Sequence, residues 1–309
     1  MDYRKRLAGA IIALPENMFY NTGIATYIWV LTNRKQEHRK GKVQLIDATK
    51  WYAPLRKNLG KKNCEFSSEH IRKICDLVIS FVENEQSKCL PNEAFGYWKI
   101  TVERPLRLRV DLSEASLGSF RQVCKKEKEG ALIGVIESVA KKLGPGPHLD
   151  FNAFLTAVET DAKENSVKLT PQRVNFLQAS LGHKDETAQP IISKVHKPGK
   201  IRANPLYGKY EREINGKKCV IEYEPDPELR DTEQVPLLED GGIEPFFKRE
   251  VLPYMPDAWV DESKTQIGYE ISFTRYFYKP EPMRTLEEIK ADILALERET
   301  EGLLEDILD

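Results

Sequence analysis

The sequence predicts an α/β fold in its first third, followed by a mainly α-helical region. Three observations lead to this prediction: a continuous apolar run at Ala10–Leu14, a β-branched and aromatic run at Ile24–Leu31, and long amphipathic segments beyond Leu112. A short apolar run that ends at a proline is typical of a strand buried on both faces of a mostly parallel sheet. With 309 residues, the chain is long enough for about two domains.

The composition sets bounds on the class of protein. Charged residues make up 31% and apolar residues 40% of the chain, which is ordinary for a globular protein. Five scattered cysteines without a CxxC pair indicate neither a disulfide framework nor a zinc knuckle, and five histidines show no metal-ligand spacing. The apolar runs are far shorter than the roughly 20 residues that span a bilayer. We therefore expect a cytoplasmic protein without a bound metal.

Three strands are predicted in the first 50 residues. Ala10–Leu14 is the buried strand, Ile24–Leu31 has high β propensity, and Lys42–Ala48 follows a charged turn. Because the link between the second and third strands is short, we expect these two to form an antiparallel hairpin at the edge of the sheet.

A helix and a fourth strand complete the predicted α/β unit. Ser67–Phe81 has apolar residues at steps of three and four, with Ser68 as the expected N-cap. Phe95–Leu108 alternates polar and apolar residues until Pro105 stops it. The first unit is therefore expected to end near Val110.

From Asp111 onward, the sequence pattern changes from mainly strand-like to mainly helical. Two helical segments are predicted around a Gly-Pro breaker at 144–148, and the remainder alternates loops, helices and short strands. The predicted segments are helices at Leu112–Leu143, Leu149–Leu181 and Ile243–Leu252, a loop at Lys194–Lys209, strands at Lys218–Tyr223 and Glu270–Tyr278, and an extended acidic linker at Glu222–Asp240.

The C-terminal segment predicts an amphipathic helix. Thr285 followed by Glu288 forms a capping box. Apolar residues then recur at spacings of three and four, interrupted only by Thr300, in the pattern of an interhelical seam: Leu286, Ile289, Ile293, Leu296, Leu303 and Ile307. Two interpretations remain open: the stripe packs on this chain's own core, or it docks on a partner.

Positive charge is concentrated at the N-terminal end. Residues 1–62 hold 13 Lys and Arg against 4 Asp and Glu, whereas residues 222–250 and 281–309 are strongly acidic. The basic residues cluster on the turn after the second strand, at Arg34, Lys35, Arg39, Lys40 and Lys42, with Arg56, Lys57, Lys61 and Lys62 further on. They indicate either contact with DNA phosphates or an ordinary solvated turn.

The loop after the first strand is the candidate binding site. It presents Phe19, Tyr20, Asn21 and Thr22 at the end of a strand, where open α/β sheets bind their ligands.

Four stretches closely resemble one known family: LPENMFYNTGIATYIWVLTN, GKVQLIDAT, FGYWKITVERPL and IGYEISFTRYFYKP. They are similar to the modification (M) subunit of type I restriction-modification systems, an adenine-N6 DNA methyltransferase that uses S-adenosylmethionine. The resemblance covers the C-terminal part of the family's chain. It implies the last strands of a class I (Rossmann-like) methyltransferase sheet in residues 1–110, a mainly helical family-specific region with an acidic linker in 111–280, and a partner-binding helix in 281–309.

Two family motifs are missing from this sequence: the glycine-rich cofactor loop, and the Asn-Pro-Pro-Phe/Tyr motif that binds the target amino group. Gly144-Pro145-Gly146-Pro147 has alternating glycines, but its prolines lack the N–H groups that a cofactor loop uses. Asn204-Pro205-Leu206-Tyr207 is one substitution from the amino-binding motif, but a turn is the better interpretation there. We therefore expect this chain alone to be inactive.

The resemblance also implies roles for the candidate residues. Related enzymes stack the extruded adenine on an aromatic residue of this loop, which here is Phe19, with Tyr20, Asn21 and Thr22 lining the pocket; the alternative is that Phe19 packs beneath the loop as core. The C-terminal stripe would dock on the specificity subunit, beside a second M subunit, and the restriction subunit is an optional further partner. The alternative function is a non-enzymatic assembly or regulatory module that binds the specificity subunit.

Overall fold

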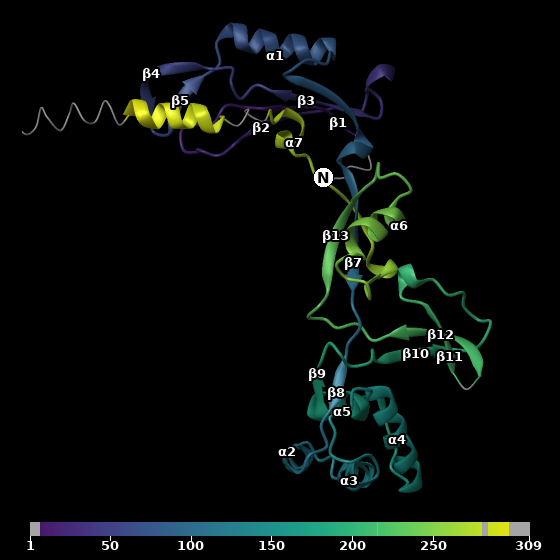
Figure 1. Cartoon of the computed structure of the whole chain (residues 1–309). Coiled ribbons are helices and arrows are strands. Elements are labelled where there is room, and N and C mark those ends of the chain that lie inside the picture. Colours follow the sequence, from purple (N-terminus) through teal and green to yellow (C-terminus); the bar gives the residue numbers. More distant parts are fainter. Residues whose placement is uncertain (1–6, 215, 280–283, 297–309) are drawn as a thin grey trace, which may run out of the picture. The chain divides into compact units, whose positions relative to one another are not determined.

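The computed structural model describes residues 7–214, 216–279 and 284–296, which form two compact units. The described parts of 1–92 and 271–309 make up the first unit, and residues 93–270 make up the second (Figure 1). This division differs from the predicted boundary near Val110. Both units contain strands and helices. The region predicted to be mainly α-helical is so only as far as Leu181, because most elements from Gly182 to Tyr269 are strands.

The first unit is built on a four-stranded sheet in the order β2-β1-β3-β6. Its strands are β1 (Ala8–Ala13), β2 (Tyr27–Leu31), β3 (Lys42–Asp47) and β6 (Ser87–Pro91). β1 is buried along its whole length, and it runs parallel to β3 but antiparallel to β2. The expected β2–β3 hairpin is therefore wrong, because the buried strand β1 lies between these two strands and pairs with both.

Helix α1 (Ser68–Ser80) packs on this sheet. Ser67, not Ser68, is the N-cap: its hydroxyl accepts the His70 N–H, and His70 Nδ1 accepts the Ser67 N–H. The apolar side of the helix covers the sheet, with Ile74, Leu77 and Val78 packed against Ile12, Leu14 and Ile46. Full burial of an aliphatic side chain contributes about 1.5–3 kcal/mol, so each of these half-buried helix residues contributes less.

Residues Glu270–Tyr278 do not form the predicted strand. They contain the short helix α7 (Phe273–Phe277), whose N-cap Ser272 accepts the Arg275 N–H. Phe273 and Phe277, four residues apart, stack with ring centroids 5.6 Å apart, and Phe273 also contacts Tyr27 of β2 at 5.1 Å. One turn of helix brings residues i and i+4 next to each other, whereas in an extended strand they share a face but lie about 13 Å apart, too far for their rings to stack.

The second unit has β7 (Gly96–Glu103) as its central strand. β13 (Asp231–Pro236), β14 (Trp259–Val260) and β15 (Gln266–Tyr269) all pair with it antiparallel. The predicted strand Phe95–Leu108 therefore exists in part, but it belongs to the second unit. The predicted linker Glu222–Asp240 is wrong over β13, in which Val235 is fully buried opposite Trp98.

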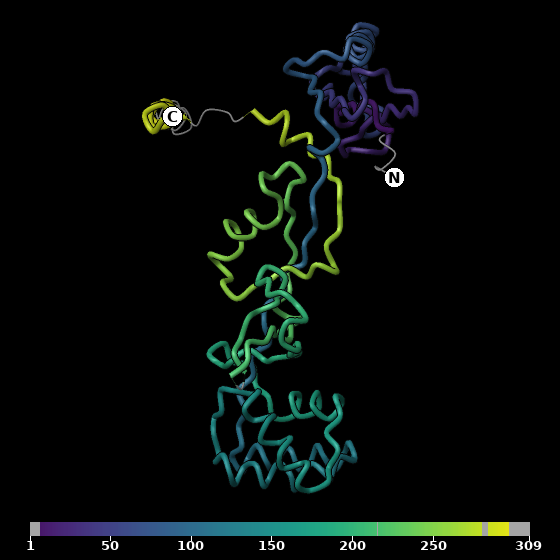
Figure 2. The backbone as a smooth tube through the Cα atoms, turned by 90° about the vertical axis from the view of Figure 1, so that its right-hand side faces the viewer, coloured from purple at the N-terminus to yellow at the C-terminus, as the bar shows by residue number. Residues whose placement is uncertain are grey.

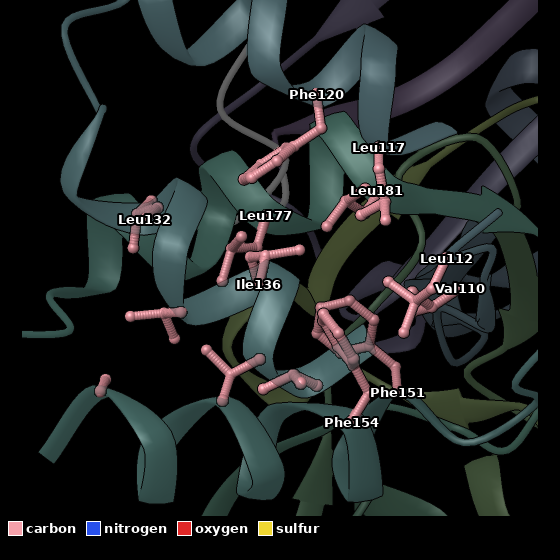
Figure 3. Close-up of a cluster of buried hydrophobic side chains, with 14 of the residues drawn as sticks. Val110, Leu112, Leu117, Phe120, Leu132, Ile136, Phe151, Phe154, Leu177 and Leu181 are labelled. Carbon is pink, nitrogen blue, oxygen red and sulfur yellow. The ribbon is translucent and has the colours of Figure 1, made fainter. Parts of the chain in front are cut away.

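Four helices form the main core of the second unit: α2 (Glu114–Lys126), α3 (Ala131–Leu143), α4 (Phe151–Glu164) and α5 (Pro171–Leu181). They confirm the two predicted helical segments and the breaker between them. Ser113, Asp150 and Thr170 cap three of the helices with side-chain oxygens. The cluster of buried side chains between the helices includes Phe120, Phe154 and Leu177 (Figure 3).

Shorter elements complete the second unit. They are β8 (Leu108–Val110) paired with β9 (Gly182–Lys184), the sheet of β10 (Ile192–His196), β12 (Lys217–Tyr223) and β11 (Tyr210–Ile214), and helix α6 (Ile243–Phe246) continued by a π-helical turn at Phe247–Val251. Figure 2 shows the backbone of this unit, whose colour passes from blue through teal and green to yellow-green along the sequence. Asn204–Tyr207 is the expected turn, with the Tyr207 N–H donating to the Asn204 carbonyl. Lys194–Lys209 is only partly a loop, because it begins in β10.

Among the described residues, none of the helices is both long enough and apolar enough to cross a bilayer.

Candidate functional site

The candidate site is a cavity at the ends of two strands of the first unit's sheet. β1 and β3 run parallel and end together, with Ala13 opposite Asp47. A cavity of about 780 Å³ opens at these ends. Its wall comes from the segment after β1, from the segment after β3 and from a β-hairpin: Leu14, Pro15, Glu16, Asn17, Ala25, Thr49, Tyr52, Pro54, Leu55, Asn58, Asn63 and Cys64. Open α/β sheets bind their ligands at the carboxyl ends of parallel strands, which is where this cavity lies.

The hairpin consists of β4 (Ala53–Leu59) and β5 (Lys62–Glu65). It holds the loop after β1 by hydrogen bonds to the loop's backbone carbonyls. The Asn63 N–H donates to the Asn17 carbonyl over 3.1 Å, the Lys61 N–H donates to the Tyr20 carbonyl over 3.0 Å, and the Cys64 thiol donates to the Glu16 carbonyl over 3.3 Å. Asn17 adopts φ +55°, a conformation that asparagine tolerates better than most residues. The loop and the hairpin therefore form one continuous wall of the cavity.

Gly60, in the hairpin turn, allows the closest of these approaches. Its φ is +64°, and a Cβ atom there would lie 2.9 Å from the Tyr20 carbonyl oxygen. Gly41 has φ +73° with open space around the same position. Both positions disfavour alanine by roughly 1 kcal/mol or more, because L-residues are strained at positive φ.

Gly60→Ala is therefore expected to destabilise the chain more than Gly41→Ala. Both substitutions add the backbone strain, but only the one at Gly60 also forces the new methyl group against the Tyr20 carbonyl. Urea denaturation of both variants measures the difference. Equal losses of stability would show that the close approach of hairpin and loop does not exist in solution.

The four predicted pocket residues lie on the loop, but none of them is part of the cavity wall. The Thr22 N–H donates to the Phe19 carbonyl over 3.5 Å, which closes a tight turn. Phe19 is 47% exposed and Tyr20 58% exposed. An exposure of this size does not fit the alternative in which Phe19 packs as core.

Sequence reasoning missed several residues of the cavity wall, above all Tyr52, Asn58 and Asn63. Tyr52 is an aromatic side chain that lines the cavity while 49% exposed. The signal was the Asn-Leu-Gly-Lys sequence at 58–61, which is a turn pattern between two short polar strands. Recognising it would have predicted the hairpin, but not its contact with the loop.

No nucleophile emerges in the cavity wall. Burial raises the pKa of the Cys64 thiol, and the charge of Lys62 offsets only part of that effect. A buried thiol with a raised pKa is a poor nucleophile. Asp47 accepts hydrogen bonds from the Thr49 N–H (3.0 Å) and hydroxyl (2.6 Å), so it orders the segment that follows β3. Among the described residues, no group of His, Cys, Asp and Glu side chains is arranged to hold a metal ion.

The five predicted DNA-contacting residues lie between β2 and the start of β3, but three of them are engaged elsewhere. Arg39 donates to the carbonyls of Val78 and Ile79 at the end of α1 and stacks 4.7 Å over the Phe81 ring. Lys40 pairs with Glu37, and Lys35 donates to the Lys42 carbonyl. Arg34 and Lys42 are exposed.

The predicted C-terminal helix is present where the structure describes it, over residues 286–296. The capping box is confirmed: the Glu288 carboxylate accepts the Thr285 N–H over 2.8 Å, and the Thr285 hydroxyl accepts the Glu288 N–H over 3.2 Å. Leu286, Ile289, Ile293 and Leu296 are between 41% and 86% exposed. Leu303 and Ile307 lie outside the described residues.

Comparisons with known proteins match part of this chain. Residues 3–95 match the family model described as N-6 DNA Methylase. The type I restriction enzyme MjaVII methylase subunit of Methanocaldococcus jannaschii is 28% identical over 153 residues, which are 44% of this chain and 25% of that protein. The MjaIX methylase subunit of the same organism is 32% identical over 79 residues, which are 26% of this chain and 13% of that protein.

One solved structure is also similar over a short stretch. It is the methyltransferase subunit of the type I restriction-modification system from Streptococcus thermophilus, with 25% identity over 28% of this chain and 17% of that chain, and a TM-score of 0.24. The chain spans a quarter or less of the length of the curated relatives that it matches. Through the family-model match and the curated relatives, this chain is related to the N-6 DNA methylase subunits of type I restriction enzymes.

Proposed function

We propose that this chain supplies the target-base side of an adenine-N6 DNA methyltransferase that works within a type I restriction-modification system. The observation that supports this most is the cavity at the ends of the parallel strands β1 and β3. It lies wholly within the stretch that matches the N-6 DNA methylase model. Under this proposal, the sheet belongs to the class I, Rossmann-like methyltransferases, and S-adenosylmethionine is the methyl donor.

The loop and the cavity fit the handling of an extruded base. An enzyme that modifies the exocyclic nitrogen of adenine must take the base out of the duplex, which costs a few kcal/mol. A half-exposed ring such as Phe19 can offset part of this by stacking, which is worth about 1–3 kcal/mol per base. Tyr20, Asn21 and Thr22 would contact the same nucleotide from the loop, and the amides of Asn17 and Asn63 would offer hydrogen bonds from the cavity wall.

The described residues do not form a site that would hold the whole of S-adenosylmethionine. No glycine lines the cavity, and the junction between β5 and α1 at Phe66–Ser67 has no glycine-rich turn to approach a cofactor. We therefore assign to this chain no step of the reaction that depends on the cofactor. The methyl donor supplies the methyl group, and this chain's residues position the base and exclude water around it.

The unpaired edge of β2 also supports the proposal that this chain holds only part of the methyltransferase sheet. Among the described residues, β2 pairs only with β1, and its five apolar side chains are each between 36% and 47% exposed. An apolar strand with a free edge is an aggregation hazard unless something covers it. Further strands of the methyltransferase sheet would cover it. We therefore expect no methylation by this chain alone.

Methylation by the assembled enzyme tests the proposal. The chain is combined with the remainder of its methylase subunit and with its specificity subunit, then incubated with DNA and labelled S-adenosylmethionine. We expect the label at adenine N6, identified by mass spectrometry of the digested DNA. Label on cytosine, or none in a correctly assembled complex, would refute the proposed reaction.

A second candidate function is a non-enzymatic assembly module. The C-terminal helix favours it, because the capping box orders a helix whose apolar stripe is exposed at Leu286, Ile293 and Leu296. Under the main proposal, this stripe docks on the specificity subunit, beside a second methylase subunit. Complex formation with the specificity subunit that persists while no methylation is measured would favour the assembly module.

A further inference from the structure

The β4–β5 hairpin carries a concentration of positive charge. Residues 48–64 contain no Asp or Glu and five basic residues, four of which lie in the hairpin itself: Arg56, Lys57, Lys61 and Lys62. Arg56, Lys57 and Lys61 are exposed. Within the described part of the chain, none of these four side chains forms an ion pair. Their charge is therefore available to a ligand, unlike that of Arg39 and Lys40 on the preceding turn.

The hairpin is fixed to the loop that carries the candidate base-stacking residue. Its turn meets the loop through the Lys61 N–H and the Tyr20 carbonyl, 3.0 Å apart, and Gly60 permits this approach. Lys62 places its ammonium group 5.7 Å from the centre of the Tyr20 ring, within the range of a cation–π contact. The hairpin backbone that carries these basic residues is therefore held beside the loop.

The same hairpin also forms a wall of the cavity. Pro54, Leu55, Asn58 and Asn63 line it, whereas the four basic residues are not part of the lining. Thus one side of the hairpin borders the space for a base, and its charged side chains lie outside that space. A nucleotide whose base entered the cavity would keep its sugar-phosphate backbone outside, because the phosphates remain charged and solvated.

We propose that the β4–β5 hairpin is a phosphate-binding element that holds the DNA backbone beside the extruded base. The choice of DNA as the polyanion rests on the proposed function; the unpaired charge and its attachment to the loop do not. Lys and Arg side chains that neutralise phosphates release condensed counterions, so the binding they produce weakens steeply as salt rises. The hairpin therefore supplies affinity that is independent of base sequence, whereas the cavity acts on the base.

A charge-matched pair of variants tests this inference. The hairpin variant combines Arg56→Gln, Lys57→Gln and Lys61→Gln, which leaves the Lys61 backbone N–H in place. The control variant combines Lys125→Gln, Lys126→Gln and Lys141→Gln on α2 and α3, where these side chains are exposed and form no ion pair with a described residue. Both variants lose three positive charges. Fluorescence anisotropy with a short fluorescein-labelled DNA duplex measures the dissociation constant between about 50 and 200 mM salt.

We expect the hairpin variant to bind several-fold more weakly and to lose about 3 from the slope of log affinity against log salt, since each lost phosphate contact removes about 0.9. The control variant should keep the wild-type slope. Equal changes in both variants would overturn the inference, and so would a wild-type chain that fails to bind the duplex at the lowest salt. Because methylation by the assembled enzyme is measured separately, its absence beside a hairpin-specific slope would refute the proposed reaction but not the phosphate-binding element.

Discussion

Replacing Phe19 with alanine in the assembled methyltransferase is expected to slow adenine methylation by between about 5-fold and about 150-fold, because stacking of a base on an aromatic ring is worth about 1–3 kcal/mol. The ring lies 47% exposed on a loop whose turn is closed by the Thr22 N–H and the Phe19 carbonyl. Its loss should therefore remove a contact to the base without opening a cavity in the protein core. Single-turnover methylation of DNA measures the effect.

Two further variants make this test specific. Phe19→Trp keeps a ring for stacking and should retain most of the rate. Tyr254→Ala removes an aromatic side chain that is 82% exposed in the second unit, and it should leave the rate unchanged. A wild-type rate for Phe19→Ala, or an equal loss in Phe19→Trp and Phe19→Ala, would remove Phe19 from the base-binding role.

The second large effect concerns stability. Leu177→Ala in α5 is expected to lower the free energy of unfolding of the second unit by about 2–5 kcal/mol, the range for a buried leucine that leaves a cavity. Leu177 is fully buried in the core between α2, α3, α4 and α5 (Figure 3). Urea denaturation followed by the far-ultraviolet circular dichroism of these helices measures the loss.

Leu143→Ala is the matched control for that measurement. Leu143 ends α3 and is 40% exposed, so its truncation removes the same atoms without leaving an enclosed cavity. We expect a change of about 0.5 kcal/mol or less, as for most surface substitutions. If the two leucine variants lost equal stability, the four-helix core would not have the packing described here.

Elements with a strong local signal could be predicted from the sequence. The continuous apolar run of β1 and the amphipathic periodicity of α2 to α5 both follow from which faces are buried, and the structure has these elements at nearly the predicted residues. The C-terminal capping box could be predicted for the same reason, since Thr285 and Glu288 satisfy each other's backbone donors locally.

The errors concern information that no local pattern holds. Strand order depends on pairing between distant segments, so the short β2–β3 link suggested a hairpin that β1 in fact separates. β13 is charged and polar because only Val235 is fully buried, and it therefore had the composition of a linker. The aromatic residues of Glu270–Tyr278 have high β propensity, but Ser272 caps a helical turn there.

Only one part of the candidate site, the loop after β1, could be predicted from the sequence. The loop after β1 could be located, because its place at the end of a buried strand is visible in the sequence. Tyr52, Asn58 and Asn63 could not be joined to it, because the contact depends on backbone hydrogen bonds between residues more than 40 positions apart. Nor could the sequence show that Arg39 is bound to the end of α1, while the basic side chains of the hairpin form no ion pair with a described residue.

The central claim is that this chain holds the target-base side of the enzyme and not the cofactor side. Calorimetric titration of S-adenosylmethionine tests it most directly, first with the 309-residue chain alone and then with the complete methylase subunit bound to its specificity subunit. We expect no binding by the chain alone and clear binding by the complete assembly. Micromolar binding by the chain alone would contradict the account, because under the proposed function this chain contributes no complete cofactor site.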